Sequence, residues 1–280
     1  MKQASFDVIG NIALVKFQKE VSSKAKKEFA EKLLKRHKSV KTVLEKIGKF
    51  KGRLRKQTTK YLAGEKTKET LYRENGCAFR FNIDSSYFSP RLSNERIEIA
   101  KKIKKEDEVL VMFAGVAPYS IIIAKKSKAS KVYSNEINRE ANRYAELNIG
   151  LNKVKGKVVL LPGDIKRVAK RLSHPPTQKK VTNNGKNIDS TLNAPRYFDT
   201  IVMPRPQLKE TFLPQAFMLS KKGTRVFYYD FCKQEEIKSI LEKIQTEAKK
   251  TKKKIKILKV KKAGEVGPYK FRIRVDFIVL

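Results

Sequence analysis

The sequence predicts an α/β protein in which a doubly wound parallel sheet follows a small α+β domain. From about residue 106 onward, short apolar runs alternate with segments whose apolar residues recur at helical spacing. Strands that alternate with helices in this way are typical of a parallel sheet covered by helices on both faces. The last two apolar runs are joined only by a short Gly-Pro connection, which predicts a terminal antiparallel pair. We place a boundary near residue 88, giving domains at 1–88 and 89–280.

The N-terminal domain is predicted from a turn signal and two periodic patterns. Gly10 and Asn11 form a two-residue turn between β-rich flanks, which is typical of a hairpin. The segment that follows carries apolar residues at helical spacing, and Phe79, Phe81 and Ile83 alternate with polar residues as in a strand. The expected elements are a hairpin, a helix, a group of short strands with basic loops and a further strand, at residues 6–17, 21–36, 40–60 and 77–84.

The larger domain is predicted to begin with a helix after Pro90, with Ile99, Ala100 and Ile103 on one face. Five sheet strands are expected at residues 109–113, 131–135, 158–161, 198–203 and 224–231, and two closing strands at 255–260 and 271–279. Helices are expected from about residue 119, at 139–148 and up to about 250. The polar stretch at 173–195 interrupts this pattern and is expected to be a surface insertion. It is either a tolerated loop or a contact for a partner.

The charge of the chain points to a phosphate polymer as its partner. Lysine and arginine number 65 against 28 acidic residues, so the net charge is +37. Basic side chains that neutralise phosphates release counterions, which favours binding. The alternative is that the lysines simply cover solvated helix faces, but an excess of this size favours nucleic acid.

The two cysteines and the lengths of the apolar runs indicate the cellular compartment that we expect for the protein. Cys77 and Cys232 lie far apart and do not form a CxxC pair, so neither a disulfide scaffold nor a zinc cluster is expected. The first 17 residues are mixed and polar, unlike a signal peptide, and no apolar run reaches the length of a membrane span. We therefore expect a cytoplasmic protein with two buried thiols.

A glycine-containing turn follows the first strand of the predicted sheet. Residues 113–120 read FAGVAPYS, directly after a strand and before a helix. Gly115 would let a ligand approach the backbone, and the helix N-terminus is electropositive. A plain tight turn is the alternative.

Two acidic residues follow the next two strands. Glu136 ends the second strand, where a carboxylate can accept both ribose hydroxyls of an adenosine-containing ligand. Asp164 follows the third strand, directly after Gly163. Each alone could be an ordinary surface carboxylate. With Gly115, at three successive strand ends, they favour a nucleotide-like ligand at the carboxyl edge of the sheet.

The arrangement of strands and several motifs resemble known proteins. Seven strands with an antiparallel ending resemble the class I methyltransferase variant of the Rossmann fold. The stretch YFSPRLSNER at residues 87–96, followed by FAGVAPYS, resembles the archaeal and eukaryotic tRNA guanosine-37 N1-methyltransferase family. Upstream, FDVIGNIA, LAGE and RENG match that family at residues 6–13, 62–65 and 73–76. The resemblance covers nearly the whole chain.

The resemblance implies a reaction and roles for three residues. S-adenosylmethionine would sit at the strand ends, and guanosine 37, next to the anticodon, would be flipped into the pocket. Glu95 matches the family's proposed general base, Arg55 the arginine that stabilises charge on guanine O6, and Tyr87 a residue that positions the base or cofactor. The alternatives are that Glu95 is a first-turn acid favoured by the helix dipole, and that Arg55 or its neighbour Arg53 is a generic phosphate contact.

The remaining expected contacts follow from the same resemblance. Cofactor contacts are expected from Phe113, Gly115, Pro118, Tyr119, Ser120, Glu136, Asp164 and Met203. Asp164 stands at a position where methyltransferases commonly use an acid to accept the adenine amino group. Contacts with the RNA base and its surroundings are expected from Arg53, Arg91, Pro204, Arg205 and Pro206. No metal is expected in this chemistry. The RNA partner is expected to be the anticodon arm of tRNA with a purine at position 37, bound with help from lysines within 233–262.

The sequence departs from the family at four places. The acid common at the end of the first strand is Val111, and the second glycine of the turn is Ala117. The loop after the fourth strand reads Pro-Arg-Pro at 204–206, which indicates an archaeal subgroup that also methylates the tricyclic wyosine precursor, 4-demethylwyosine. The family's extra N-terminal domain, which grips the outer corner of tRNA, is expected to be absent.

Two further functions compete with N1-methylation. The same fold and cofactor serve an aminocarboxypropyl transferase that acts on the wyosine precursor. A tRNA-binding protein with a decayed cofactor site would explain Val111 and Ala117. The serine-proline-arginine-leucine motif favours methyl transfer.

Overall fold

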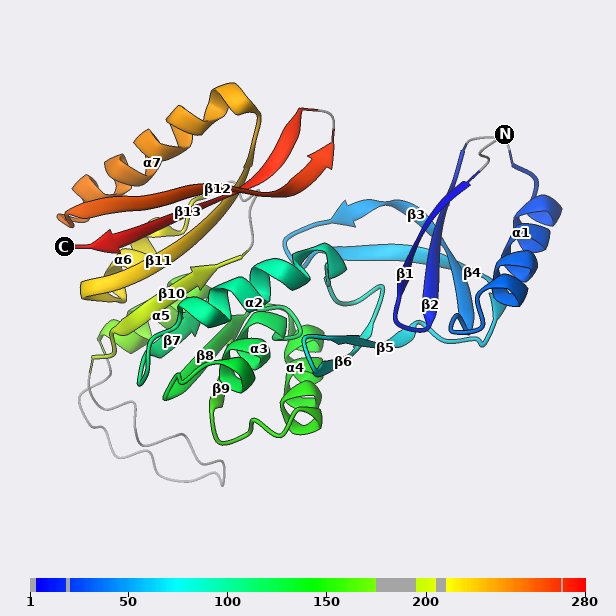
Figure 1. Ribbon diagram of the computed structural model, residues 1–280, viewed down its shortest axis with the longest axis horizontal. Helices are drawn as coiled ribbons and strands as arrows, with labels where there is room; N and C mark the ends of the chain where they lie inside the picture. The colour runs from blue at the N-terminus through cyan, green and yellow to red at the C-terminus, as the bar shows by residue number, and fades with distance from the viewer. Residues whose placement is uncertain (1–3, 19–20, 175–194, 205–209, 268) are drawn as a thin grey trace.

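The computed structural model describes residues 4–18, 21–174, 195–204, 210–267 and 269–280. A four-stranded sheet near the N-terminus and a seven-stranded sheet lie next to each other along the longest axis of the molecule (Figure 1). A separate two-stranded hairpin lies between them. The arrangement confirms the predicted α/β class with a small preceding domain.

The small sheet is built from two antiparallel pairs joined side by side through one parallel contact. Its strands are β1 (Ala4–Ile9), β2 (Ile12–Phe17), β3 (Thr42–Lys51) and β4 (Lys56–Gly64), in that order. The predicted hairpin turn is confirmed, with Gly10 at a φ of +59°. Helix α1 (Ser23–Arg36) supplies the crossover that the parallel β2–β3 contact requires.

The expectation of short strands with basic loops over residues 40–60 is wrong. β3 and β4 are long strands that pair from Thr42 with Gly64 to Lys51 with Lys56. In β4, Gln57 and Thr59 are buried and the lysines on either side are exposed. The basic residues occupy the solvent face of a strand, where their charge does not oppose pairing.

The hairpin of β5 (Glu69–Glu74) and β6 (Cys77–Asn82) packs on the larger domain. Two buried asparagines of helix α4 (Arg139–Leu151) and its C-cap hold the backbone of β6. Asn148 Oδ1 accepts from Arg80 N at 2.7 Å, and its Nδ2 donates to Arg80 O at 3.1 Å. Asn152 makes the same pair of bonds to Ala78. Side-chain amides thus take the place of a neighbouring strand beside β6. The division of the chain into two domains at residue 88 stays a prediction.

The large sheet has the strand order β12-β13-β11-β10-β7-β8-β9. Its bounds are β7 (Glu108–Val111), β8 (Lys131–Glu136), β9 (Val158–Pro162), β10 (Phe198–Met203), β11 (Ser220–Cys232), β12 (Ile255–Gly267) and β13 (Lys270–Val279). Five strands are parallel, and β13 runs antiparallel to both β11 and β12. The predicted parallel sheet with a terminal antiparallel pair is confirmed.

Helices cover both faces of this sheet (Figure 1). The 3-10 turn η1 (Pro90–Leu92), α2 (Ser93–Lys102), α3 (Pro118–Lys126) and α4 form one apolar layer with the β5–β6 hairpin. On the other face lie α5 (Ile165–Ser173), α6 (Leu213–Met218) and α7 (Ile237–Lys250), with η3 (Gln234–Glu236) leading into α7. Helix α6 was not predicted, because its apolar run is too short to show a period.

Two boundaries differ from the prediction for local reasons. β7 stops at Val111, two residues early, and Phe113 adopts a left-handed φ of +58° that ends the extended chain. β12 continues to Gly267, beyond the predicted 260, through register shifts in its pairing with β13. Most of the predicted insertion, residues 175–194, lies outside the described part of the chain.

Within the described residues, no helix combines the length and the apolar character that crossing a membrane requires.

The hydrogen bonds from Asn148 and Asn152 to the backbone of β6 lead to a prediction about stability. We expect Asn148→Leu to lower the free energy of unfolding by about 2 kcal/mol, because it leaves the part-buried backbone amide and carbonyl of Arg80 without these partners. Urea denaturation followed by circular dichroism measures the change. Glu146→Ala, on the exposed side of the same helix, should change the unfolding free energy far less. Equal losses from both variants would show that the asparagine hydrogen bonds do not stabilise the fold.

Candidate active site

A cavity of about 70 Å³ opens at the carboxyl ends of β7, β8 and β10, where parallel α/β sheets bind ligands. The turn before α3, from the larger domain, and the loop between β3 and β4, from the small domain, both line this cavity. Predicted site residues that line it are Arg53, Arg55, Tyr87, Phe113, Gly115, Pro118, Tyr119, Glu136 and Pro204.

The turn between β7 and α3 is held in an unusual backbone conformation. Phe113, Gly115 and Ala117 all have positive φ angles, of 58°, 59° and 65°. Only glycine adopts that region without strain. A Cβ at Gly115 would lie 3.3 Å from the carbonyl oxygen of Tyr87. The second glycine that the family uses is therefore not required for the turn, since Ala117 adopts the same conformation.

Glu136 is fixed by backbone amides at the floor of the cavity. Its Oε2 accepts from Gly115 N and its Oε1 from Asn138 N, both at 2.8 Å. A carboxylate has about four lone-pair sites, so both oxygens can still accept a hydroxyl donor. This geometry suits the two hydroxyls of a ribose.

Asp164 is occupied by an arginine of the small domain. It caps helix α5 through Lys166 N at 2.9 Å, and its other oxygen lies 2.8 Å from Arg53 Nη2. Burial tends to raise the pKa of this carboxyl, but the bonds from Arg53 and the helix amide lower it below its usual value. Asp164 lines a neighbouring cavity, which Arg53 shares. Arg53 thus occupies the Oδ2 side of the carboxyl group that is expected to accept the adenine amino group.

The loop between β3 and β4 forms the roof of the site. The Arg55 guanidinium lies over the ring of Tyr87, 4.9 Å from its centroid. Leu54 O accepts a long hydrogen bond of 3.4 Å from Asn138 Nδ2. Arg55 and Tyr87 therefore stand together at the side of the cavity that faces the small domain.

Glu95 lies in the first turn of α2, is 5% exposed and does not line the cavity. Its oxygens accept from Lys261 Nζ at 2.6 Å, Arg274 Nη1 at 2.7 Å and the Tyr229 hydroxyl at 2.9 Å. Tyr119, which does line the cavity, donates to the Tyr229 hydroxyl at 3.4 Å. Two phenols thus connect the cavity to Glu95.

Glu98 stands one helical turn after Glu95 and contacts the same two cations. It accepts from Arg274 Nη2 at 2.8 Å and from Lys261. Asp276 accepts from Arg274 Nε at 2.6 Å. Burial would raise the pKa of Glu98, but the Arg274 and Lys261 bonds lower it to about 2. Burial raises the pKa of Tyr119 to about 12 and that of Tyr229 well above its usual value.

Sequence reasoning missed Tyr229, Lys261 and Arg274. The signal was present in the predicted last strand, where Arg272, Arg274 and Asp276 alternate with apolar residues and which the structure shows to be largely buried. Charges at alternate positions of a buried strand share one face and need partners there.

The other predicted residues lie apart from the cavity or outside the described chain. Ser120 is buried and donates to Ser134 Oγ at 2.9 Å, and Met203 is buried at the end of β10. Arg91 is exposed and pairs with Asp7 at 3.3 Å. Arg205 and Pro206 lie outside the described residues. In the parts of the chain that are described, no group of three or more potential metal ligands occurs.

Comparison with known proteins identifies similar chains. The family model of the TRM5/TYW2 methyltransferase domain matches residues 70–184, and that of the TYW2 N-terminal domain matches residues 2–67. The tRNA (guanine(37)-N(1))/4-demethylwyosine(37)-methyltransferase Taw22 of Nanoarchaeum equitans is 34% identical over 304 residues, which cover 99% of this chain and 100% of that protein.

Solved structures agree with these matches. The crystal structure of Trm5b from Pyrococcus abyssi has a TM-score of 0.79 at 33% identity, over 98% of this chain and 74% of that one. A complex of aTrm5 with tRNALeu also has a TM-score of 0.79, at 27% identity, over 99% of this chain and 72% of that one.

The lowered pKa of Glu98 predicts how its ion pairs respond to acid. Because its folded pKa of about 2 lies below its ordinary value of 4.5, the ion pairs stabilise the fold fully above about pH 4.5. That stabilisation is lost as the pH falls toward about 2. We expect the unfolding free energy of Glu98→Gln to vary less with pH across this window than that of the parent. Denaturation at several pH values, with exposed Glu242→Gln as the control, measures it; parallel profiles for both variants would contradict the prediction.

Proposed function

The chain belongs to the TRM5/TYW2 methyltransferase family, and from that premise we propose that it transfers the methyl group of S-adenosylmethionine to N1 of guanosine 37 in tRNA. The observation that supports this most is the cavity at the strand ends. There Glu136 is positioned by two amides, beside an Arg55–Tyr87 pair from the small domain.

The residues around the cavity fit S-adenosylmethionine. Glu136 would accept the ribose hydroxyls, and a Cβ at Gly115 would crowd the Tyr87 carbonyl oxygen at 3.3 Å, so glycine keeps the backbone open beside them. Asp164 would accept the adenine amino group once Arg53 has moved, and Arg53 is exposed enough to do so. When bound, S-adenosylmethionine supplies an electrophilic methyl group.

The target nitrogen must lose its proton when it attacks. We propose that this proton reaches Glu95 through the two phenols. The Tyr119 oxygen accepts it and gives its own proton to Tyr229, which gives its own to Glu95. The high pKa of both phenols keeps them protonated, as donors in such a chain must be. Arg55 would stabilise the negative charge left on guanine O6.

We infer that the wyosine precursor is a second substrate. The Nanoarchaeum equitans relative carries both activities in its name, and it aligns along its whole length. Pro204 lines the cavity and offers no amide donor. Aminocarboxypropyl transfer is the second candidate, since it needs only a different pose of the same cofactor.

The RNA surface is proposed to include the lysines of α7, of β12 and of the turn between them. Lys249, Lys254, Lys256 and Lys259 are exposed there. Such contacts position the RNA without reading its sequence. Both cysteines are free and buried, which fits the reducing cytoplasm in which we place the protein.

The first test is the reaction itself. We expect purified protein, given methyl-labelled S-adenosylmethionine, to form 1-methylguanosine on a tRNA with guanosine 37 and no product on one with adenosine 37. Nucleoside mass spectrometry locates the methyl. Methylthioadenosine instead of S-adenosylhomocysteine as the spent cofactor would show aminocarboxypropyl transfer. A tRNA carrying 4-demethylwyosine tests the second substrate, and no label on it would remove that activity.

Two neighbouring glutamates test the route of the proton. We expect Glu95→Gln to lower the single-turnover rate by about 10²–10⁴-fold, the usual contribution of a general base. Glu98→Gln removes a carboxylate from the same two cations but not from the phenols, and should lower the rate far less. Tyr229→Phe should lower the rate while leaving the affinity for S-adenosylmethionine unchanged. Equal losses from both glutamate variants would mean that the ion pairs only hold the fold.

A further inference from the structure

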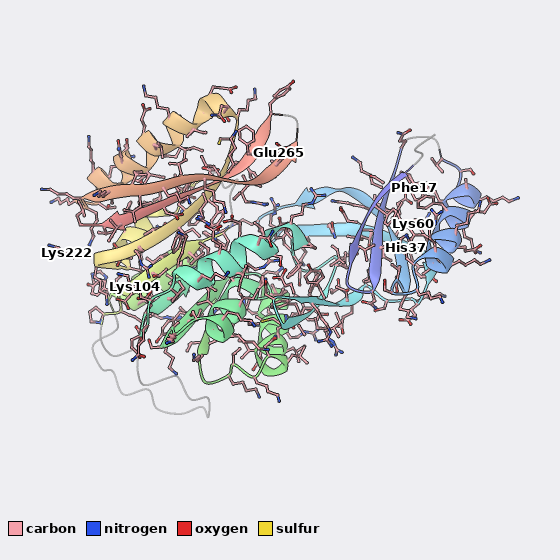
Figure 2. The ribbon with its side chains drawn as sticks, in the orientation of Figure 1. Phe17, His37, Lys60, Lys104, Lys222 and Glu265 are labelled. Atoms are coloured by element: carbon pink, nitrogen blue, oxygen red, sulfur yellow. The ribbon has the colours of Figure 1, made fainter. Side chains whose placement is uncertain are left out.

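A second cavity, of about 310 Å³, lies between the small sheet and the β12–β13 hairpin. It shares Arg55, Tyr87 and Phe231 with the cavity at the strand ends. Its far side is formed by β12, at Glu265, which Figure 2 labels in the hairpin. A molecule that enters it therefore lies directly beside the proposed methyl-transfer site.

Arg272 lines this cavity and stands at the end of a column of charges on β13. Arg274 and Asp276 lie on the same face, and the Arg274 charge is matched by carboxylates of α2 and by Asp276. Arg272 is two residues nearer the cavity, opposite Phe231 on β11. The carboxylates that serve Arg274 contact no part of Arg272.

Arg272 is buried without an anionic partner. It is 6% exposed, and its contact is with the Phe231 ring, 5.1 Å from the centroid. Among the described residues it makes no hydrogen bond or ion pair, and its Nε is buried and unsatisfied. The two acidic residues of the cavity do not serve it: Asp7 pairs with Arg91, and exposed Glu265 makes no ion pair within the described chain. A buried charge without a hydrogen-bonding or anionic partner lowers the stability of the fold unless a ligand supplies that partner.

Two further buried polar groups of the cavity wall are unsatisfied. Gln57 is 8% exposed; its Nε2 donates to Ile83 O at 3.0 Å, but its Oε1 has no partner. The Ser86 hydroxyl, 2% exposed, also has none among the described residues. Phe81, Ile83 and Phe88 provide apolar surface between these groups. The wall thus combines an unpaired donor, an unpaired acceptor and flat apolar surface.

We propose that Arg272 donates from this cavity to the keto oxygen of the target base, beside Arg55, which lines both cavities, so that N1 of the base can face Tyr119 in the cavity at the strand ends. Arginine pairs preferentially with the keto oxygen of guanine. The apolar wall favours a planar base over a phosphate. This inference rests on the proposed function and adds to it a determinant of guanine over adenine.

The test is Arg272→Met, with Arg272→Lys as the conservative variant. tRNA binding is measured by fluorescence anisotropy, with guanosine or 2-aminopurine, which lacks the keto oxygen, at position 37. The parent should bind the guanosine tRNA more tightly by about 10–100-fold, the usual value of a specific arginine–base contact. Arg272→Met should lose this preference, and Arg272→Lys should keep part of it. Glu265→Gln, exposed on the same cavity, should keep it in full.

Two further readouts separate recognition from a structural role and from phosphate binding. Because Arg272 has no anionic partner and Met can still pack on the Phe231 ring, Arg272→Met should lower the melting temperature little, whereas Arg274→Met should lower it strongly. The salt dependence of binding should be unchanged, since a lost phosphate contact would reduce its slope by about 1.

Three results would overturn the inference. The first is a preserved preference for guanosine in Arg272→Met, and the second is an equal loss for both tRNAs with a reduced salt slope. The third is a lowered melting temperature with loss of binding in both Arg272 variants. If the parent methylates guanosine 37 while any of these holds, the proposed function stands and this inference alone fails.

Discussion

The buried guanidinium of Arg274 is the interaction on which the rest of the site depends. It is fully buried, so its charge must be met by carboxylates at hydrogen-bond distance. Glu95 and Glu98 come from α2, and Asp276 comes from β13 itself. Removing one partner of such a pair costs about 3–5 kcal/mol, because the other charge is left uncompensated. This constraint fixes the rotation and position of α2 against the end of the sheet.

The position of α2 in turn fixes both sides of the site. Arg96, the residue after Glu95, forms a buried ion pair with Glu74 of the β5–β6 hairpin and donates to Ser89 O at 3.0 Å. Its guanidinium also lies over the rings of Phe88 and Tyr119. One face of α2 therefore positions Glu95, the proposed proton acceptor, and the adjacent face positions the segment that carries Tyr87. A shift of this helix would move the candidate base and the cavity wall together.

The sequence predicted those parts of the site whose geometry is local. Gly115 and Glu136 follow consecutive strands of a parallel sheet, so the alternation of strands and helices alone brings them to one edge. Arg274 and Glu95 are 179 residues apart, and their contact depends on the register of β13 with β11 and on the packing of α2. No periodicity encodes such a register. The lysines of β4 had the opposite effect: a basic composition was interpreted as a loop, whereas Lys56 and Lys60 lie on the solvent face of a strand.

The ion pair between Arg53 and Asp164 couples the two domains through the cofactor site. Arg53 belongs to the loop of the small domain that roofs the cavity, and Asp164 is the acid expected to receive adenine. The arginine side chain is 58% exposed, and ion pairs of this kind contribute at most about 1 kcal/mol, so a ligand can displace it at little cost. Its displacement would release a cation on the same loop that carries Arg55 toward the RNA. Occupation of the cofactor site would thus increase the positive charge that the roof presents to a phosphate backbone.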